Sequence, residues 1–265
     1  MDKHKKLRQT LKALPESRRL LVYLIFGVLG TIIITLASFL NRQSGNQLPS
    51  VLAKALVALA ALWLAGAEAF IPLRNKKSLI WLILAGAAVP AVFLVFRLGR
   101  ITESPSPTAV LTMLCSIFLT ALWEEAVFRL WGRLLFEEEE SYKARDFLWM
   151  AVVFGCMHLL NLLFGEDPHM VLIQAAFATV TAVFMQTVYC KSGSLGLIIG
   201  VHFFINAASQ LVPLFIKEEN RFLRHLAGLD IIIGGFFFAI SAALIARKGN
   251  IIRRGRPFLK FRRKE

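Results

Sequence analysis

Three groups of ionisable and amide side chains lie inside hydrophobic segments of this 265-residue chain: Glu124, Glu125 and Arg129; Phe154 and His158; His202 and Asn206. Ionisable groups inside a membrane are costly and usually mark a functional site. A carboxylate with an imidazole can activate water and relay its proton, and an imidazole with an amide can stabilise an oxyanion. The three groups together predict a water-filled hydrolytic cavity among hydrophobic helices.

Helical spacing limits how the first group can act. Glu124 and Glu125 are adjacent, so about 100° of α-helix separates their directions, although both can border one cavity. Arg129 follows Glu125 by four residues on the same face, where a buried ion pair can form. We expect one glutamate to be held ionised by the arginine while the other acts as a base. A purely structural Glu–Arg pair is the alternative.

The histidines are weaker signals when each is taken alone. His202 and Asn206 are four residues apart and project from one helix face, and they could be a packing pair joined by a hydrogen bond. His158 could be a satisfied core histidine. However, Glu124, His158 and His202 all fall about 12–18 Å from the same boundary of their segments, at 1.5 Å per helical residue. This common depth favours one shared site.

Composition places these residues in a membrane protein. Hydrophobic residues make up 57% of the chain and the mean hydropathy is +0.62, above the share of roughly 45–50% that is usual for soluble proteins. The net charge of +14 gathers at the two ends, with seven Lys/Arg in residues 1–19 and nine in 247–264. Basic clusters beside membrane segments fit the positive-inside rule and anionic lipids, so nucleic acid is not an expected partner. Three cysteines without a CxxC pattern predict neither a disulfide framework nor a cysteine metal site.

The hydrophobic pattern predicts an all-α, polytopic membrane protein with about eight spans and a catalytic cavity within the helix bundle. The expected domain organisation is a basic cytoplasmic leader (1–19), one transmembrane catalytic domain (20–246) and a basic cytoplasmic tail (247–265). An even number of spans puts both termini on one side, which the loop charges assign to the cytoplasm of a cell membrane, or of the endoplasmic reticulum in a eukaryote. The expected spans are 20–40, 51–72, 78–97, 109–135, 146–164, 171–190, 194–216 and 226–246.

Turn residues support several of these boundaries. The run Ser104-Pro-Ser-Pro107 can start the fourth span, Glu166-Asp-Pro168 separates the fifth from the sixth, and Ser192-Gly-Ser194 opens the seventh. Lys54 and Glu68, near opposite ends of the second span, are expected to reach the membrane interfaces.

The ordered motifs Glu-Glu-x-x-x-Arg, Phe-x-x-x-His and His-x-x-x-Asn, over roughly residues 109–210, resemble the CAAX-protease and bacteriocin-processing (CPBP, or Abi) family of intramembrane endopeptidases. The resemblance implies eight helices around a cavity that opens toward the cytoplasmic side. By motif position, Glu124 would activate water with help from His158. Glu125 and Arg129 would orient the site, and His202 with Asn206 would hold the oxyanion.

The resulting hypothesis is a glutamate-type intramembrane endopeptidase that cleaves a membrane-associated or lipid-modified protein or peptide. Both CAAX C-terminal processing and bacteriocin or signal-peptide processing fit this hypothesis. The expected partners are the peptide or lipidated-protein substrate and the membrane lipids. No cofactor is favoured, although a zinc enzyme with Glu124, His158 and His202 as ligands is an alternative. Two alternative functions of other classes are also compatible with the sequence. The protein could be a proton-coupled transporter, or a catalytically silent immunity or scaffold protein of the same fold.

Overall fold

The computed structural model describes residues 3–44, 47–66, 104–137, 142–211, 215 and 252–253. The helices are α1 (Lys3–Ala13), α2 (Glu16–Ser44), α3 (Leu48–Ala65), α5 (Pro107–Glu124), the π-helix η2 (Glu125–Leu130), α6 (Trp131–Phe136), α7 (Ala144–Met157), the 3₁₀ helix η3 (His158–Phe164), α8 (Pro168–Ser192) and α9 (Leu195–Gln210). Two short strands, β1 (Tyr142–Lys143) and β2 (Ile252–Arg253), pair in parallel.

The all-α membrane fold is confirmed. Within the described residues, five helical stretches are long and apolar enough to cross a membrane: Glu16–Asn41, Leu48–Ala65, Pro107–Phe136, Arg145–Phe164 and Pro168–Cys190. A shorter apolar helix covers Leu195–Ala207, inside the seventh expected span. The third and eighth expected spans lie outside the described residues, so the total of eight stays a prediction.

Three helices begin at the turn residues that the sequence indicated. The side chains of Ser106, Asp167 and Ser194 accept hydrogen bonds from the backbone amides of the third residues of α5, α8 and α9, respectively. Pro107 and Pro168 occupy the first helical positions of α5 and α8, where a missing N–H costs nothing. These caps fix where the site-bearing helices start and therefore how deep their polar residues lie.

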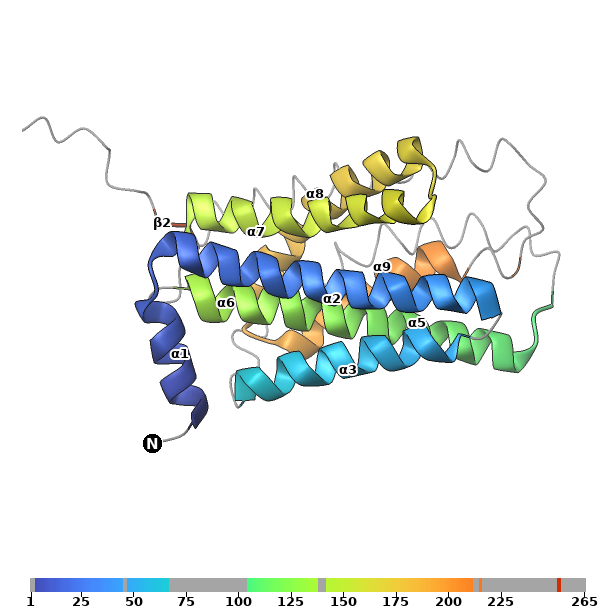
Figure 1. The fold of residues 1–265 in the computed structure, drawn as a ribbon, viewed down its shortest axis with the longest axis horizontal. Coiled ribbons are helices and arrows are strands. Elements are labelled where there is room, and N and C mark those ends of the chain that lie inside the picture. The colour runs from blue at the N-terminus through green and yellow to red at the C-terminus, as the bar shows by residue number, and fades with distance from the viewer. Residues whose placement is uncertain are drawn as a thin grey trace, which may run out of the picture.

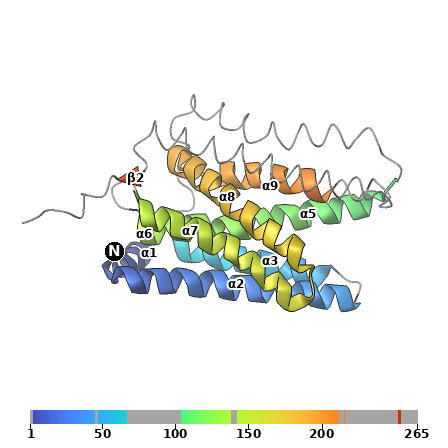
Figure 2. The ribbon, with the colours of Figure 1, turned by 90° about the horizontal axis from the view of Figure 1, so that it is seen from above.

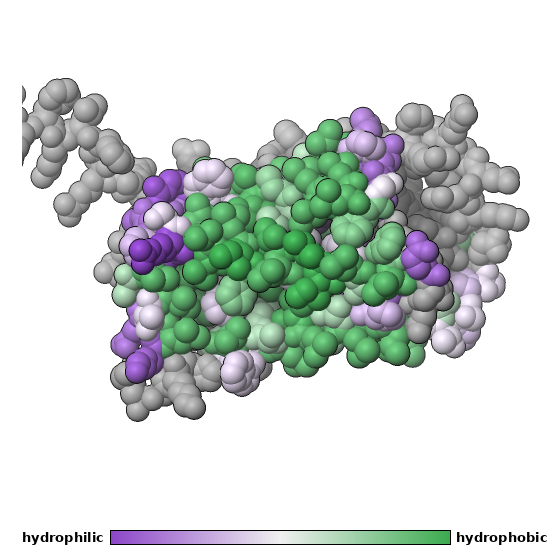
Figure 3. Space-filling view, in the orientation of Figure 1, coloured by the Kyte–Doolittle hydropathy of each residue, from purple (hydrophilic) through white to green (hydrophobic). Residues whose placement is uncertain are grey.

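The outer surface of the bundle is apolar. Figure 3 shows a broad hydrophobic area across the middle of this face, with polar residues toward its two ends. Large side chains stand exposed on several helices, among them Leu56, Trp63 and Leu163 at 66%, 73% and 75% exposure. The hydrocarbon of a lipid bilayer can cover a contiguous apolar surface of this kind, so this surface agrees with the multi-pass membrane character of the chain.

The helices form a bundle whose long members run roughly side by side. In Figure 1, α2, α3 and α5 lie along one another, while α1 turns away from the start of α2. Figure 2, seen from above, shows α7 and α8 running beside each other and α9 lying along α5. Gly155 permits the close approach of α7 to α8, because an added Cβ would lie 2.7 Å from the Ala175 carbonyl oxygen and would overlap the Thr179 hydroxyl.

The helix that carries the glutamates is continuous from Pro107 to Phe136 but changes type on the way. Its six residues from Glu125 to Leu130 form a π-helix, in which the hydrogen bonds span five residues instead of four. The Tyr23 hydroxyl of α2 donates a 3.0 Å hydrogen bond to the backbone carbonyl of Phe128 within this stretch. A side chain from the first span therefore supports the irregular part of the helix.

Candidate functional site

The change of helix type begins between the two glutamates and lets one histidine reach both. The Nδ1 atom of His202 lies 2.6 Å from Oε1 of Glu125, and its Nε2 atom lies 3.5 Å from Oε2 of Glu124. A π-helix turns by less per residue than an α-helix, so neighbouring side chains stay closer in direction than the 100° used for the sequence prediction. Two carboxylates and an imidazole from two separate segments thus meet in one place.

Glu125 is held from two sides at the centre of this cluster. Its side chain is fully buried, and Oε2 lies 3.2 Å from Nε of Arg129, which is 2% exposed. Oε1 accepts from His202, and since an ionised carboxylate can only accept, Nδ1 is the protonated nitrogen. The remaining nitrogen, Nε2, then faces Glu124. Glu125 and Arg129 therefore fix the position and the tautomer of His202.

Phe154 packs the cluster together. The guanidinium carbon of Arg129 sits 4.1 Å from the centre of the Phe154 ring, a cation–π distance. The same ring meets the imidazoles of His158 and His202 edge to face, with centroids 5.2 Å and 6.5 Å apart. Nδ1 of His158 lies 3.1 Å from the Phe154 carbonyl oxygen, which orients that ring too. Phe154 in α7 thus links the arginine and both histidines.

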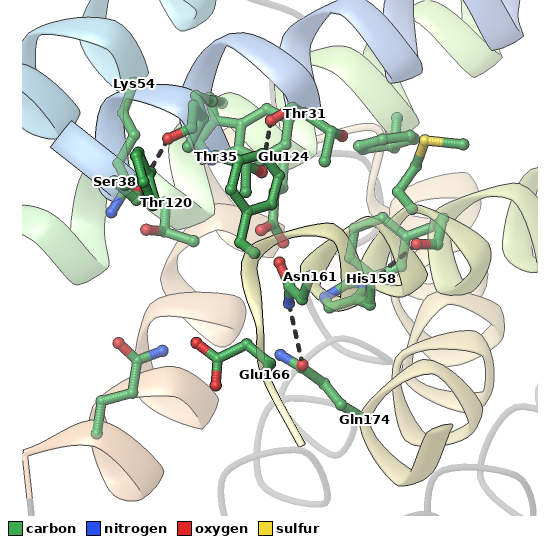
Figure 4. Close-up of a pocket in the computed structure, with 18 residues that line it drawn as sticks. Thr31, Thr35, Ser38, Lys54, Thr120, Glu124, His158, Asn161, Glu166 and Gln174 are labelled. Atoms are coloured by element: carbon green, nitrogen blue, oxygen red, sulfur yellow. Dashed lines mark hydrogen bonds between the residues drawn. The ribbon is translucent and has the colours of Figure 1, made fainter. Parts of the chain in front are cut away.

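Glu124 and His158 line a cavity of about 300 Å³. Figure 4 shows Glu124 among the drawn residues with Lys54 and Thr120 on one side and His158 and Asn161 on the other. The cavity is large enough for a short stretch of extended peptide or for several waters. Glu124 is about nine-tenths buried, so it borders the cavity from a setting that is largely shielded from solvent.

The structure brings the predicted site residues together to different degrees. Glu124, Glu125, Arg129 and His202 are joined by direct contacts, and His158 joins them through Phe154 and the shared cavity. Asn206 is half-buried one turn beyond His202 on α9, so its place beside the site rests on helical spacing. The sequence paired His202 with Asn206, whereas in the structure His202 contacts both glutamates.

Part of the cavity comes from helices whose role the sequence did not indicate. Thr31, Thr35 and Ser38 line it from α2, at spacings of four and three residues that place them on one helix face. Each hydroxyl donates to the backbone carbonyl four residues earlier, at 2.7–2.9 Å, which leaves its lone pairs as acceptors. The helical spacing of these hydroxyls in an apolar segment is the signal that would have found them.

Lys54 corrects one sequence expectation. It was expected to reach the outer membrane interface, but its side chain lines the cavity, and Nζ donates a 2.9 Å hydrogen bond to the Ser116 hydroxyl of α5. Ser116, Thr120 and Glu124 follow each other at four-residue spacing and form a polar stripe along α5. The hydrogen bond to Ser116 therefore keeps the ammonium group inside the bundle and away from the membrane interface. Glu68, the companion of Lys54 in that expectation, lies outside the described residues.

The cavity extends along the bundle from Glu124. Its lining includes Phe39 near the end of α2, Glu166 just before α8 and Gln210 at the end of α9, and Figure 1 shows the end of α2 on the side of the bundle away from α1. The cytoplasmic opening that the family resemblance implied stays a prediction, as does the side of the membrane on which the termini lie.

The zinc alternative would take its ligands from Glu124, His158 and His202. Across the described ranges, no three His, Cys, Asp or Glu side chains are arranged to hold a metal ion. Both ring nitrogens of His202 face carboxylates, and Nδ1 of His158 faces a backbone carbonyl. Zinc would need a ring nitrogen of each histidine directed at one point, with space for a fourth ligand.

One comparison with known proteins matches the part of the chain that carries the predicted site residues. Residues 106–208 match the family model described as type II CAAX prenyl endopeptidase Rce1-like. The matched segment runs from the N-cap of α5 to near the end of α9 and includes every predicted site residue. No curated protein and no solved structure matches the chain.

Proposed function

We propose, from the match of residues 106–208 to the Rce1-like family model of type II CAAX prenyl endopeptidases, that the protein hydrolyses a peptide bond near the C-terminus of prenylated proteins within the membrane. A CAAX sequence carries its prenyl group on a cysteine and ends three residues later. The single observation that supports hydrolysis most is the contact of His202 with both Glu124 and Glu125 beside a cavity. This arrangement provides a base, an oriented imidazole and room for a peptide.

In the proposed reaction, Glu124 takes a proton from a water molecule in the cavity as the water oxygen attacks the scissile carbonyl carbon. His158, on the facing wall, helps to hold that water. The carbonyl oxygen becomes an oxyanion, and the carbon–nitrogen bond then breaks. Glu124 returns its proton to the leaving amine, so the products are a new carboxylate and a free amine. Proton transfer by a positioned group contributes about 10²–10⁴-fold to the rate.

His202 is proposed to stabilise the oxyanion together with Asn206. Because Nδ1–H is committed to Glu125, donation from Nε2 requires the doubly protonated ring. Glu124 and Glu125 face that ring from its two sides and favour its positive charge. Removing one oxyanion donor typically costs about 10²–10³-fold in kcat.

The test uses the full chain purified in detergent and a farnesylated peptide that ends in a CAAX sequence. We expect the wild type to release the C-terminal tripeptide, detected by mass spectrometry, and Glu124→Gln to lower kcat by about 10²-fold or more. Glu137→Gln is a matched control, because Glu137 is also buried and ion-paired, at the C-cap of the same long helix, but lies 13 residues farther along, outside the cavity. Its kcat should stay within about threefold of wild type. Absence of cleavage by the wild type, or equal loss in both variants, would refute the proposal.

A further inference from the structure

We propose that Lys54 of α3 binds the C-terminal carboxylate of the substrate and thereby sets how many residues lie between that carboxylate and the cleaved bond. This inference rests on the proposed endopeptidase function and concerns a residue outside the segment that matches the family. It follows from the position of Lys54 in the cavity, its chemistry and its separation from Glu124.

The lining of the cavity makes Lys54 the group suited to an anion. Among the lining residues that the structure describes, Lys54 is the one lysine or arginine, while Glu124 and Glu166 are acidic. The hydroxyls of Thr31, Thr35 and Ser38 are committed as donors to their own helix and present acceptors. A peptide carboxylate entering this space would be repelled by the acids and would find its cationic partner at Lys54.

The Lys54 ammonium is also fixed in place. It donates to Ser116 at 2.9 Å, and the Thr120 hydroxyl on the next turn of α5 donates to the Ser116 backbone carbonyl. An ammonium group has three donors, so the bond to Ser116 leaves capacity for a carboxylate. Holding the cation before substrate arrives lowers the entropy cost of binding.

The spacing between Ser116 and Glu124 along α5 is close to the length of a CAAX tail. Ser116, which positions the ammonium, precedes Glu124 by eight residues, or about 12 Å along the helix at 1.5 Å per residue. Three extended residues span about 10 Å at 3.3 Å each. A peptide with its scissile carbonyl beside Glu124 therefore places the carboxylate of its third following residue near Lys54.

The experiment compares two farnesylated peptides of one sequence, a free C-terminal acid and its C-terminal amide. For the wild type we expect kcat/KM to favour the acid by roughly 10- to 100-fold, the range of a hydrogen bond to a charged group. In Lys54→Met the acid-to-amide ratio should fall to about one, through a higher KM for the acid. Lys54→Arg should retain most of the preference, because it keeps the charge.

A third peptide with four residues after the farnesylated cysteine tests the spacing. The wild type should cleave it about tenfold less efficiently than the three-residue form, and Lys54→Met should not distinguish the two. A wild-type acid-to-amide ratio near one overturns the inference without any variant, even if Lys54→Met fails to fold. An equal loss on acid and amide in Lys54→Met also overturns it, because Lys54 would then act on Glu124 and not on the substrate. Both results still show cleavage, whereas no cleavage of any peptide by the wild type refutes the endopeptidase function itself.

Discussion

Replacing Glu125 with glutamine should separate the structural role of the buried cluster from its catalytic role. The Glu125 side chain is fully buried and Arg129 is 2% exposed. Breaking a buried pair by removing one partner leaves an uncompensated charge and typically costs about 3–5 kcal/mol. Glutamine keeps the shape and one acceptor for His202 but removes the charge. We therefore expect Glu125→Gln to lower the free energy of unfolding by about 3–5 kcal/mol.

The same variant should lose activity for a second reason. The charge of Glu125 keeps the proton of His202 on Nδ1 and favours the protonated ring, so its loss should lower kcat by about 10²-fold even where the protein stays folded. The double variant Glu125→Leu with Arg129→Met removes both charges, and an apolar replacement of a buried pair is often neutral or stabilising. We expect the double variant to regain most of the stability and none of the activity.

The assays are denaturant titration in detergent, followed by helix content, and cleavage of the farnesylated peptide under folded conditions. Glu137→Gln serves as the control, since it breaks the Arg133–Glu137 pair of the same i,i+4 spacing at the C-terminal end of the same helix. This control should lose stability while kcat stays near the wild-type value. Wild-type stability of Glu125→Gln would show that the charge is not buried as the geometry indicates. Activity in the double variant would remove Glu125 and Arg129 from the catalytic account.

Three further outcomes are expected. Tyr23→Phe should lower the free energy of unfolding by about 1 kcal/mol, because it removes the hydrogen bond to the Phe128 carbonyl; an unchanged unfolding midpoint would contradict this support of the π-helix. Gly155→Ala should lower the free energy of unfolding by about 1–3 kcal/mol, because the added methyl group forces α7 away from α8, and kcat should fall as His158 shifts. The melting curve measures the loss of stability and peptide cleavage measures kcat. Wild-type stability together with wild-type kcat would count against the close contact of α7 and α8. Cleavage should persist after treatment with a zinc chelator, because in the proposed mechanism Glu124 itself activates the water. Loss of activity that added zinc restores would overturn the metal-free mechanism.

Much of the fold was predictable because its signals are local. Apolar length indicates a span, and the caps at Ser106, Asp167 and Ser194 are set by the residues themselves and the next turn. The approximate depth of Glu124, His158 and His202 followed from these boundaries. The sequence could therefore predict that these three residues lie in one cluster.

The contacts inside the cluster were less accessible. Standard α-helical spacing points the side chains of Glu124 and Glu125 in different directions. No residue type within Glu125–Leu130 marks the π-helix that brings both carboxylates to His202. For Lys54, the sequence shows the length of the side chain and its place near a helix end, but not the polar stripe that faces it from α5. Both depend on which helices become neighbours, and that is decided by packing across the whole bundle.

The π-helix makes the length of the catalytic span as important as its composition. With its wider turn, the segment from Glu125 to Leu130 takes up about one residue more than an α-helix of the same rotation, so α6 keeps the direction it would have in a regular helix. Deleting one residue there would close the turn to a regular α-helix and leave Trp131 and Arg133, both buried, facing their partners on α3 and α8. Inserting one residue into the same segment would instead rotate α6 by about 100° relative to α5 and take both side chains away from these partners. Insertions in these six positions should consequently be tolerated far less well than a single deletion.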